Sequence, residues 1–100
     1  MHSAQLYISA AHPAFAGHFP GQPLLPGVSL LAEVLEAVLR EPALARRVGR
    51  SPRLGVVKFL APVRPGATLT LQFDDTATAL RFEVRSTEHL VASGHFETAP

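Results

Sequence analysis

The chain has 100 residues, 47% of them hydrophobic, and a formal net charge of +1 at pH 7 with neutral histidines. This length suits a single domain, and the apolar content excludes a disordered chain. There is no cysteine, which excludes disulfides and thiolate metal sites, so we expect a cytoplasmic protein. The N-terminal stretch has no signal-peptide pattern, and its longest apolar run is far shorter than the roughly 20 residues that span a membrane.

The first half of the sequence predicts one strand, one loop and one helix. Residues 5–9, QLYIS, predict a short strand, and the proline- and glycine-rich residues 12–27 predict an ordered loop. A helix is predicted for about residues 28–40, directly after a Pro-Gly step. Pro42 ends it, because proline disfavours helical conformation at the residue before it.

The second half predicts a basic loop and then a meander of four strands, at residues 54–60, 67–74, 79–86 and 89–97. In two of them apolar and polar residues alternate, so Leu69, Leu71, Phe73, Leu80, Phe82 and Val84 are predicted to face the core. This order of elements is typical of the α+β class. The helix is expected to lie on the concave side of the sheet, because its apolar surface would otherwise be exposed to water.

The predicted helix has one narrow polar stripe and is otherwise apolar. At 100° per residue, Ser29, Glu33, Glu36 and Arg40 fall within about 60° of one another. Such apolar content in a small domain indicates that some apolar surface is buried against a partner. We therefore expect a dimer in which two sheets pair edge to edge.

A basic segment without acidic residues follows the helix and contains Arg46, Arg47, Arg50, Arg53, Lys58 and Arg64. It is either a solvated loop and strand edge or a docking patch for an acidic partner. Nucleic acid is not expected as a partner, because the segment has a single aromatic residue, Phe59, and no binding motif.

Two motifs resemble a known family. GHFPGQPLLPGV at residues 17–28, followed by an apolar helix, resembles the signature of the hotdog-fold 3-hydroxyacyl-[acyl carrier protein] dehydratases of fatty-acid biosynthesis. KFLAPVRPGATL at residues 58–69 is similar to the family's next strand and the Pro-Gly turn after it. The short chain is more similar to the small dehydratase-like proteins of aryl-polyene pathways. The resemblance covers roughly residues 12–97 and implies a hotdog fold, an antiparallel sheet wrapped around one central apolar helix, as a single domain over residues 1–100.

The resemblance also implies a reaction, in which a base takes the C2 proton of a 3-hydroxyacyl thioester, an acid protonates the leaving hydroxyl and a donor polarises the carbonyl. His18 matches the family's catalytic histidine, and Gly27 matches the residue whose backbone N–H binds the thioester oxygen. Phe19, Pro26 and Val28 are the other implied substrate-binding residues. The implied partner is an acyl carrier protein. No cofactor beyond its phosphopantetheine and no metal site are expected.

The family's acid, fourteen residues after the histidine, falls on Ala32 in this sequence. Glu33 is adjacent but about 100° around the helix, whereas Glu36 is about 40° away and one turn further along. Helical side chains lean toward the N-terminus, so Glu36 is the better replacement. Alternatively, both carboxylates belong to a solvated stripe in which Glu36 pairs with Arg40.

Three functional readings remain open. The chain is an active dehydratase with an unusual or water-mediated acid, or a non-catalytic subunit that gives half a site to a related hotdog chain in a heterodimer. The third reading is a hotdog thioesterase or acyl-binding module. The remaining histidines show no ligand-like clustering and are interpreted as surface or core residues: His2, His12, His89 and His95.

Overall fold

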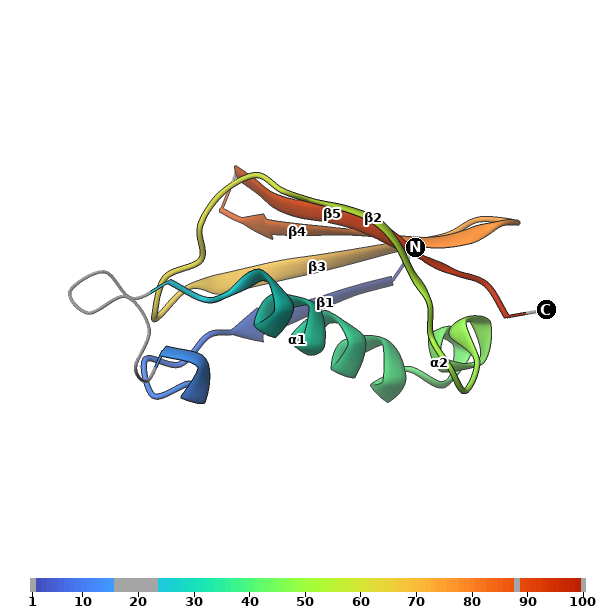
Figure 1. The fold of residues 1–100 in the computed structure, drawn as a ribbon, viewed down its shortest axis with the longest axis horizontal. Helices are drawn as coiled ribbons and strands as arrows, with labels where there is room; N and C mark the ends of the chain where they lie inside the picture. The colour runs from blue at the N-terminus through green and yellow to red at the C-terminus, as the bar shows by residue number, and fades with distance from the viewer. Residues whose placement is uncertain (1, 16–23, 88, 100) are drawn as a thin grey trace.

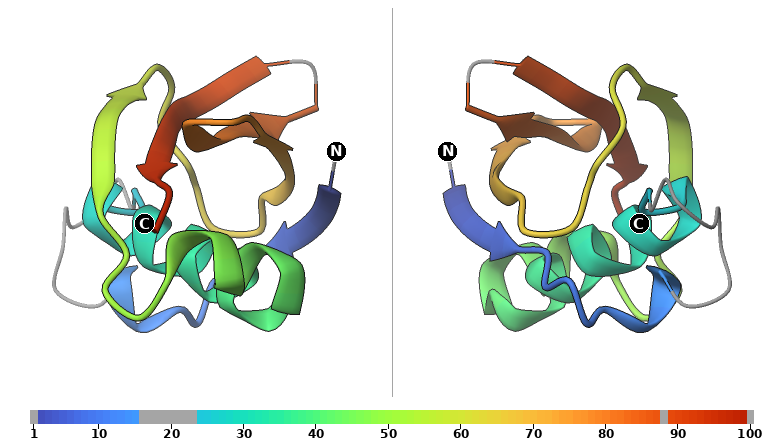
Figure 2. Two further views of the ribbon diagram at one scale, coloured as in Figure 1. Left: turned by 90° about the vertical axis from the view of Figure 1, so that its right-hand side faces the viewer. Right: turned by 90° about the vertical axis from the view of Figure 1, so that its left-hand side faces the viewer.

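The structure is a computed structural model that describes residues 2–15, 24–87 and 89–99 (Figure 1). Its strands are β1 (His2–Tyr7), β2 (Leu54–Phe59), β3 (Thr68–Asp75), β4 (Ala79–Ser86) and β5 (His89–Glu97), and its helices are η1 (Pro13–Phe15), α1 (Gly27–Arg40) and α2 (Pro42–Val48). The strands form one antiparallel sheet in the order β1-β3-β4-β5-β2. End-on views show the sheet curving over α1, as predicted (Figure 2). Within these ranges, no helix is both long and apolar enough to cross a membrane.

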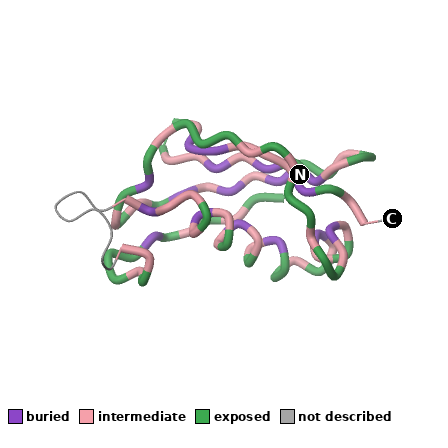
Figure 3. The backbone as a smooth tube through the Cα atoms, in the orientation of Figure 1, coloured by how far each residue is buried: buried purple, intermediate pink, exposed green. Residues whose placement is uncertain are grey.

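The core lies between the concave face of the sheet and one face of α1. All six strand residues predicted to face the core are buried, which confirms the alternation in β3 and β4. Leu30, Val34 and Val38 are the buried residues of α1, and their spacing of four residues places them on one face of the helix. The purple segments of Figure 3 trace this layer between helix and sheet.

Residues 42–48, predicted as part of a loop, form the short helix α2, so that prediction is wrong. Pro42 does end α1 after Arg40, but it also begins the next helix. Proline suits the first helical position because its missing N–H would have no partner there and its φ is already helical. The Glu41 side chain accepts a hydrogen bond from the Ala43 N–H at 3.4 Å, and Leu44 and Val48 bury the inner face.

Both edge strands differ from the prediction. β1 begins at His2, three residues earlier than predicted. It pairs with β3 along its whole length, because the backbone N–H and C=O groups on that side of β3 have no other strand to pair with. β2 pairs with β5 and not with β3, so only β3, β4 and β5 form the predicted meander. Residues 60–67 then cross the end of the sheet to β3, and Gly66 adopts a φ of 84° while its N–H donates to the Ile8 carbonyl at 2.7 Å.

One glycine of β2 is required by close packing. A methyl group added at Gly55 would overlap the imidazole of His95, which occupies that space on the neighbouring strand. The ladder between β2 and β5 is irregular between Leu54 and Val57, directly around this contact. The His95 ring therefore helps to determine how the edge strand β2 sits on the sheet.

Candidate functional site

An apolar groove opens where the N-terminus of α1 meets the end of β2. It has a volume of about 620 Å³ and is lined by Leu24, Leu25, Gly27, Val28, Leu30, Phe59, Leu60, Ala61, Pro62 and Val63. Each of these residues is apolar, so the described lining contributes no titratable side chain. The groove suits an acyl chain, and any acid or base must come from outside this lining.

The start of α1 presents backbone donors at this groove. The Pro26 carbonyl accepts hydrogen bonds from the N–H groups of Ser29 at 3.0 Å and Leu30 at 3.1 Å, which begins the helix. No side chain caps this terminus, and among the described residues no acceptor is found for the N–H groups of Gly27 and Val28. Free N–H groups at the positive end of a helix dipole stabilise an oxygen that gains negative charge.

Phe59, the last residue of β2, covers Gly27. A methyl group added at Gly27 would lie 2.8 Å from the Cζ atom of the phenyl ring and 3.0 and 3.1 Å from its two Cε atoms. The ring therefore rests on the first residue of α1 and forms a wall of the groove. Sequence analysis missed this contact, because the two residues belong to distant elements and no spacing rule joins them.

Glu33, one of the two predicted carboxylates, is bound by a histidine of its own chain. His12 Nε2 lies 3.0 Å from Glu33 Oε1, and the two side chains are 21% and 23% exposed. His12 Nδ1 accepts a hydrogen bond from the Ala14 N–H at 3.1 Å, so in this geometry the proton is on Nε2 and is donated to Glu33. The ring of Phe15 packs edge-on against His12. The pair therefore fastens the chain around η1 to α1.

Glu36, the other predicted carboxylate, lies on an open face of α1. Its side chain is 60% exposed, and the nearest cation is Arg40, 4.0 Å away in an i, i+4 pair. Ala32, at the position of the family's acid, is also exposed, as are Val28 and Leu39. Within the described part of the chain, Glu36 is therefore open to solvent, whereas Glu33 is engaged by His12.

The predicted basic segment does not form one patch. Arg46 and Arg47 belong to α2, which lies beyond the C-terminal end of α1 (Figure 1), whereas Arg64 directly follows Val63, a lining residue of the groove. Arg47 binds Asp75 Oδ1 at 2.7 Å and the Thr76 carbonyl at 2.6 Å, and Arg53 Nη1 lies 3.9 Å from Glu97 Oε2. Among these arginines of the basic segment, Arg64 is therefore the one next to the groove.

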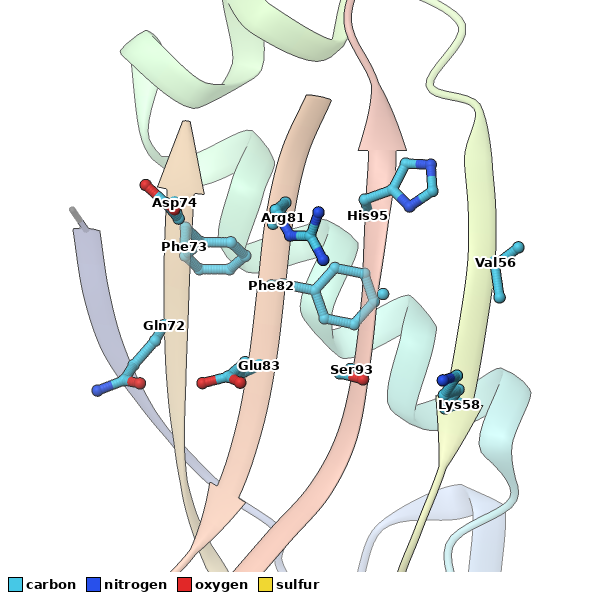
Figure 4. Close-up of a pocket in the computed structure, with 11 residues that line it drawn as sticks. Val56, Lys58, Gln72, Phe73, Asp74, Arg81, Phe82, Glu83, Ser93 and His95 are labelled. Atoms are coloured by element: carbon cyan, nitrogen blue, oxygen red, sulfur yellow. The ribbon is translucent and has the colours of Figure 1, made fainter. Parts of the chain in front are cut away.

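A second hollow lies on the other face of the sheet, away from the helices. It has a volume of about 430 Å³, and Figure 4 shows its lining with the helices behind the sheet. Lys58, Arg81 and His95 line it together with the carboxylates of Asp74 and Glu83. Because the two signs of charge are mixed, this hollow has no preference for an anion or a cation.

Of the predicted substrate-binding residues, Gly27 and Val28 line the apolar groove, and Pro26 directly precedes them as the N-cap residue of α1. His18 and Phe19 lie outside the described residues, in the segment that joins Phe15 to Leu24. Where the described chain resumes, the Leu25 N–H donates to the Val63 carbonyl at 2.8 Å.

Comparisons with known proteins agree with the motifs. The family model described as ApeI-like, ApeI dehydratase, matches residues 1–95. The chain is 37% identical over 75 residues to 3-hydroxyacyl-[acyl-carrier-protein] dehydratase FabZ of Chlamydia trachomatis serovar L2, covering 69% of this chain and 49% of that protein. It is 41% identical over 76 residues to FabZ of Oenococcus oeni, covering 68% and 52% of the two chains. The chain spans about half the length of the curated relatives it matches.

Solved structures give the same result over nearly the whole chain. A chain of the dehydratase heterocomplex ApeI:P from Xenorhabdus doucetiae superposes with a TM-score of 0.77 at 29% identity, covering 98% of this chain and 86% of that one. A protein from Erwinia carotovora subsp. atroseptica gives a TM-score of 0.76 at 30% identity, covering 98% and 82%. The predicted hotdog fold is confirmed, and the chain belongs to the ApeI-like dehydratase family, whose similar curated proteins are 3-hydroxyacyl-[acyl-carrier-protein] dehydratases.

Proposed function

We propose that this chain takes part in dehydrating a 3-hydroxyacyl thioester that an acyl carrier protein presents on its phosphopantetheine. The observation that carries the proposal is the apolar groove lined by Gly27, whose N–H has no acceptor among the described residues. A lipid-like chain fits the lining, and a thioester oxygen fits the N–H groups at the start of α1. An ionic substrate would find no counter-charge in the described lining.

In the proposed reaction, the neutral imidazole of His18 accepts a proton from C2 of the substrate. The electron pair of that C–H bond forms the C2=C3 double bond, and the C3–O bond breaks. The acid gives its proton to the departing hydroxyl, which leaves as water, while the Gly27 N–H stabilises the charge that develops on the thioester oxygen. The product is the 2-enoyl thioester.

For the acid we propose Glu36 in place of the residue missing at Ala32. Glu33 is the weaker candidate, because its carboxylate already accepts the His12 N–H. Glu36 lies one turn of α1 beyond Ala32 on the exposed face, and its one ion pair among the described residues is with the exposed Arg40, 4.0 Å away. A carboxylate on that face reaches a reaction centre only if another surface closes over it.

We infer that a second hotdog chain closes over this face and pairs with β2. The outer edge of β2 has no strand neighbour among the described residues, and its exposed side chains include Leu54, Val56 and Phe59. On the opposite edge, β1 exposes Tyr7 as its one large apolar side chain within the described residues. The β2 edge is therefore the better candidate for joining two sheets, since apolar side chains there are covered on pairing.

A second candidate function is that of a half-site subunit whose partner supplies the acid. Two observations favour it: Ala32, at the family's acid position, is exposed on α1, and the described lining of the apolar groove has no titratable residue. The similar chain from Xenorhabdus doucetiae belongs to a dehydratase heterocomplex. In this case the partner would be a related hotdog chain that carries its own carboxylate.

The experiment is a dehydration assay with a 3-hydroxybutyryl carrier protein, in which absorbance follows the conjugated enoyl thioester. The chain is assayed alone and with a related hotdog chain. We expect product in at least one arrangement, loss of the rate with His18→Ala, and no loss with the exposed control His2→Ala. Product only with the second chain would establish the half-site subunit. No product in either arrangement, or full activity of His18→Ala, would contradict the proposal.

A further inference from the structure

The hydrogen bond between His12 and Glu33 joins two segments that carry different parts of the proposed site. Resting on the proposed function, we infer that His12 is a positioning residue, which holds η1 on α1 and thereby sets the distance between the proposed base His18 and the Gly27 N–H. In this role neither His12 nor Glu33 touches the substrate. The inference starts from the 3.0 Å contact between His12 Nε2 and Glu33 Oε1.

Both ring nitrogens of His12 are used within the chain. Nε2 donates to Glu33, and Nδ1 accepts the Ala14 N–H at 3.1 Å. The backbone is held as well, because the His12 N–H donates to the Ser9 carbonyl and the His12 carbonyl accepts the Phe15 N–H, each at 3.0 Å. The ring therefore has no nitrogen left for a substrate, and the turn to which it belongs defines its orientation.

The bond to Glu33 is the one polar connection between this turn and the helix. Among the described residues, no other hydrogen bond joins residues 9–15 to α1. Ala14 and Phe15 add apolar contacts with the core, so loss of the bond should displace η1 without releasing it. The side chains of the pair are mostly shielded from water, which strengthens the bond.

Glu33 lies on the same helix as the proposed oxygen-binding N–H. It follows Gly27 by six residues in α1, a distance of about 9 Å along the helix axis. His18 follows Phe15 by three residues in the sequence, and three residues span at most about 11 Å. Leu24 is six residues beyond His18 and allows about twice that span, so η1 is the closer restraint on the proposed base. The helix is thus the common reference for the base and the donor.

The proposed reaction depends on this distance. The base takes a proton from C2, which is bonded directly to the carbonyl carbon whose oxygen the Gly27 N–H stabilises. Both groups must therefore reach one substrate at the same time, and a displacement of about 1 Å can cost about a hundredfold in rate. Because η1 keeps its apolar contacts, we expect a loss of about tenfold when the bond is removed.

The test is a double-mutant cycle on the dehydration rate, measured in the arrangement of chains in which wild type is active. His12→Ala and Glu33→Ala should each lower kcat about tenfold and leave KM nearly unchanged, because the groove is intact. The double variant should lose no more than either single variant, since each substitution removes the same bond. His12→Gln, whose amide can still donate to Glu33, should recover part of the rate.

Val48→Ala is the control for lost stability, because Val48 is buried in α2, beyond the other end of α1, and does not line the groove. It should destabilise the protein at least as much as His12→Ala does. A domain of ordinary stability remains almost fully folded after such a loss, so Val48→Ala should leave kcat unchanged. An equal loss of kcat in Val48→Ala and His12→Ala would show that destabilisation alone explains the effect and would overturn the inference.

Two further results separate this inference from the proposed function. If wild type is active and His12→Ala retains its kcat, or if the two single losses multiply in the double variant, the inference is wrong while the proposed function stands. If wild type gives no product either alone or with a related hotdog chain, the proposed function fails, and the inference fails with it.

Discussion

Two carboxylates three residues apart on α1 have opposite surroundings. Glu33 faces η1, where His12 donates a hydrogen bond to it and Phe15 packs against that histidine. Glu36 faces outward, on the side of the helix that also exposes Ala32. The chain satisfies the first carboxylate by itself and leaves the second available to a substrate or partner. A helix that is apolar almost all round thus has one face buried in the core and one face that is exposed in the single chain.

The largest expected effect is on catalysis at the open face. If His18 and Gly27 are in place and only the acid is weak, Ala32→Glu should raise the dehydration rate about a hundredfold or more, the usual scale of general-acid assistance. If Glu36 already acts as the acid, Glu36→Gln should abolish the native rate and Ala32→Glu should add little. Enoyl formation is measured for both variants.

Glu33→Gln is the control for that experiment, because an amide oxygen still accepts the His12 N–H and the rate should stay near that of wild type. If Glu33→Gln abolished the rate while Glu36→Gln had no effect, the comparison between the two carboxylates would be reversed. If wild type and all three variants were inert as homodimers, the chain alone would not be a dehydratase.

The next effect is on the free energy of unfolding, and it compares two leucines of α1, one on the buried face and one on the open face. Leu30 is 2% exposed, whereas Leu39 is 50% exposed. Leu30→Ala should lower the free energy of unfolding by about 3 kcal/mol, because it leaves a cavity in the core. Leu39→Ala should change it by less than about 0.5 kcal/mol in a monomer. Urea unfolding measures both values.

The Leu39→Ala variant also tests the proposal that a second hotdog chain covers the open face of α1. If the open face of α1 is covered in a dimer, Leu39→Ala should also raise the dissociation constant of that dimer, as measured by sedimentation or light scattering. A monomeric wild-type chain at micromolar concentration would contradict the expected dimer.

A smaller effect is expected at the His12–Glu33 pair. His12→Ala removes the donor and should lower the free energy of unfolding by about 1 kcal/mol, typical of a single partly buried hydrogen bond. His89→Ala, at an exposed position at the start of β5, is the matched control and should have almost no effect. An equal effect of both substitutions would show that the pair does not hold η1 to α1.

The smallest expected effect is on the affinity for an acyl carrier protein, compared for charge reversals at the two ends of the molecule. Arg64→Glu, at the groove end, should weaken binding of an acyl carrier protein about fivefold and reduce the dependence of binding on salt. Arg46→Glu, on α2, should change it less, because α2 lies beyond the other end of α1. Equal weakening by both reversals would instead show that the carrier protein does not distinguish the groove end from the α2 end.

Sequence patterns predicted the helix and strands whose formation depends on neighbouring residues in the chain. The strands at 79–86 and 89–97 match β4 and β5, and α1 begins within one residue of its predicted start. The partner of β2 could not be predicted, because its sequence does not specify which strand edge it will meet. The contact of His12 with Glu33 was missed for a related reason: a lone histidine in a loop carries no signal until the loop is folded back on the helix.

For the site, the motif predicted Pro26, Gly27 and Val28 as substrate-binding residues; Gly27 and Val28 line the apolar groove, and the binding roles stay predictions. The roles of His18 and Phe19 stay predictions, since they are outside the described residues. The choice between Glu33 and Glu36 needed the structure. Helical geometry places both near Ala32, and only the His12 contact shows that one of them is already engaged.

The strand order has a consequence for how the chain folds. β3, β4 and β5 are joined by short turns and pair as neighbours, whereas β1 must find β3 across most of the sequence. Pairing between distant segments is slow, because the closure entropy of the loop has to be overcome first. During synthesis, β1 and the apolar α1 leave the ribosome before any of the sheet that will cover them exists. Pulse-labelled hydrogen exchange should therefore protect the amides of β4 before those of β1, and in that interval the chain is most exposed to aggregation.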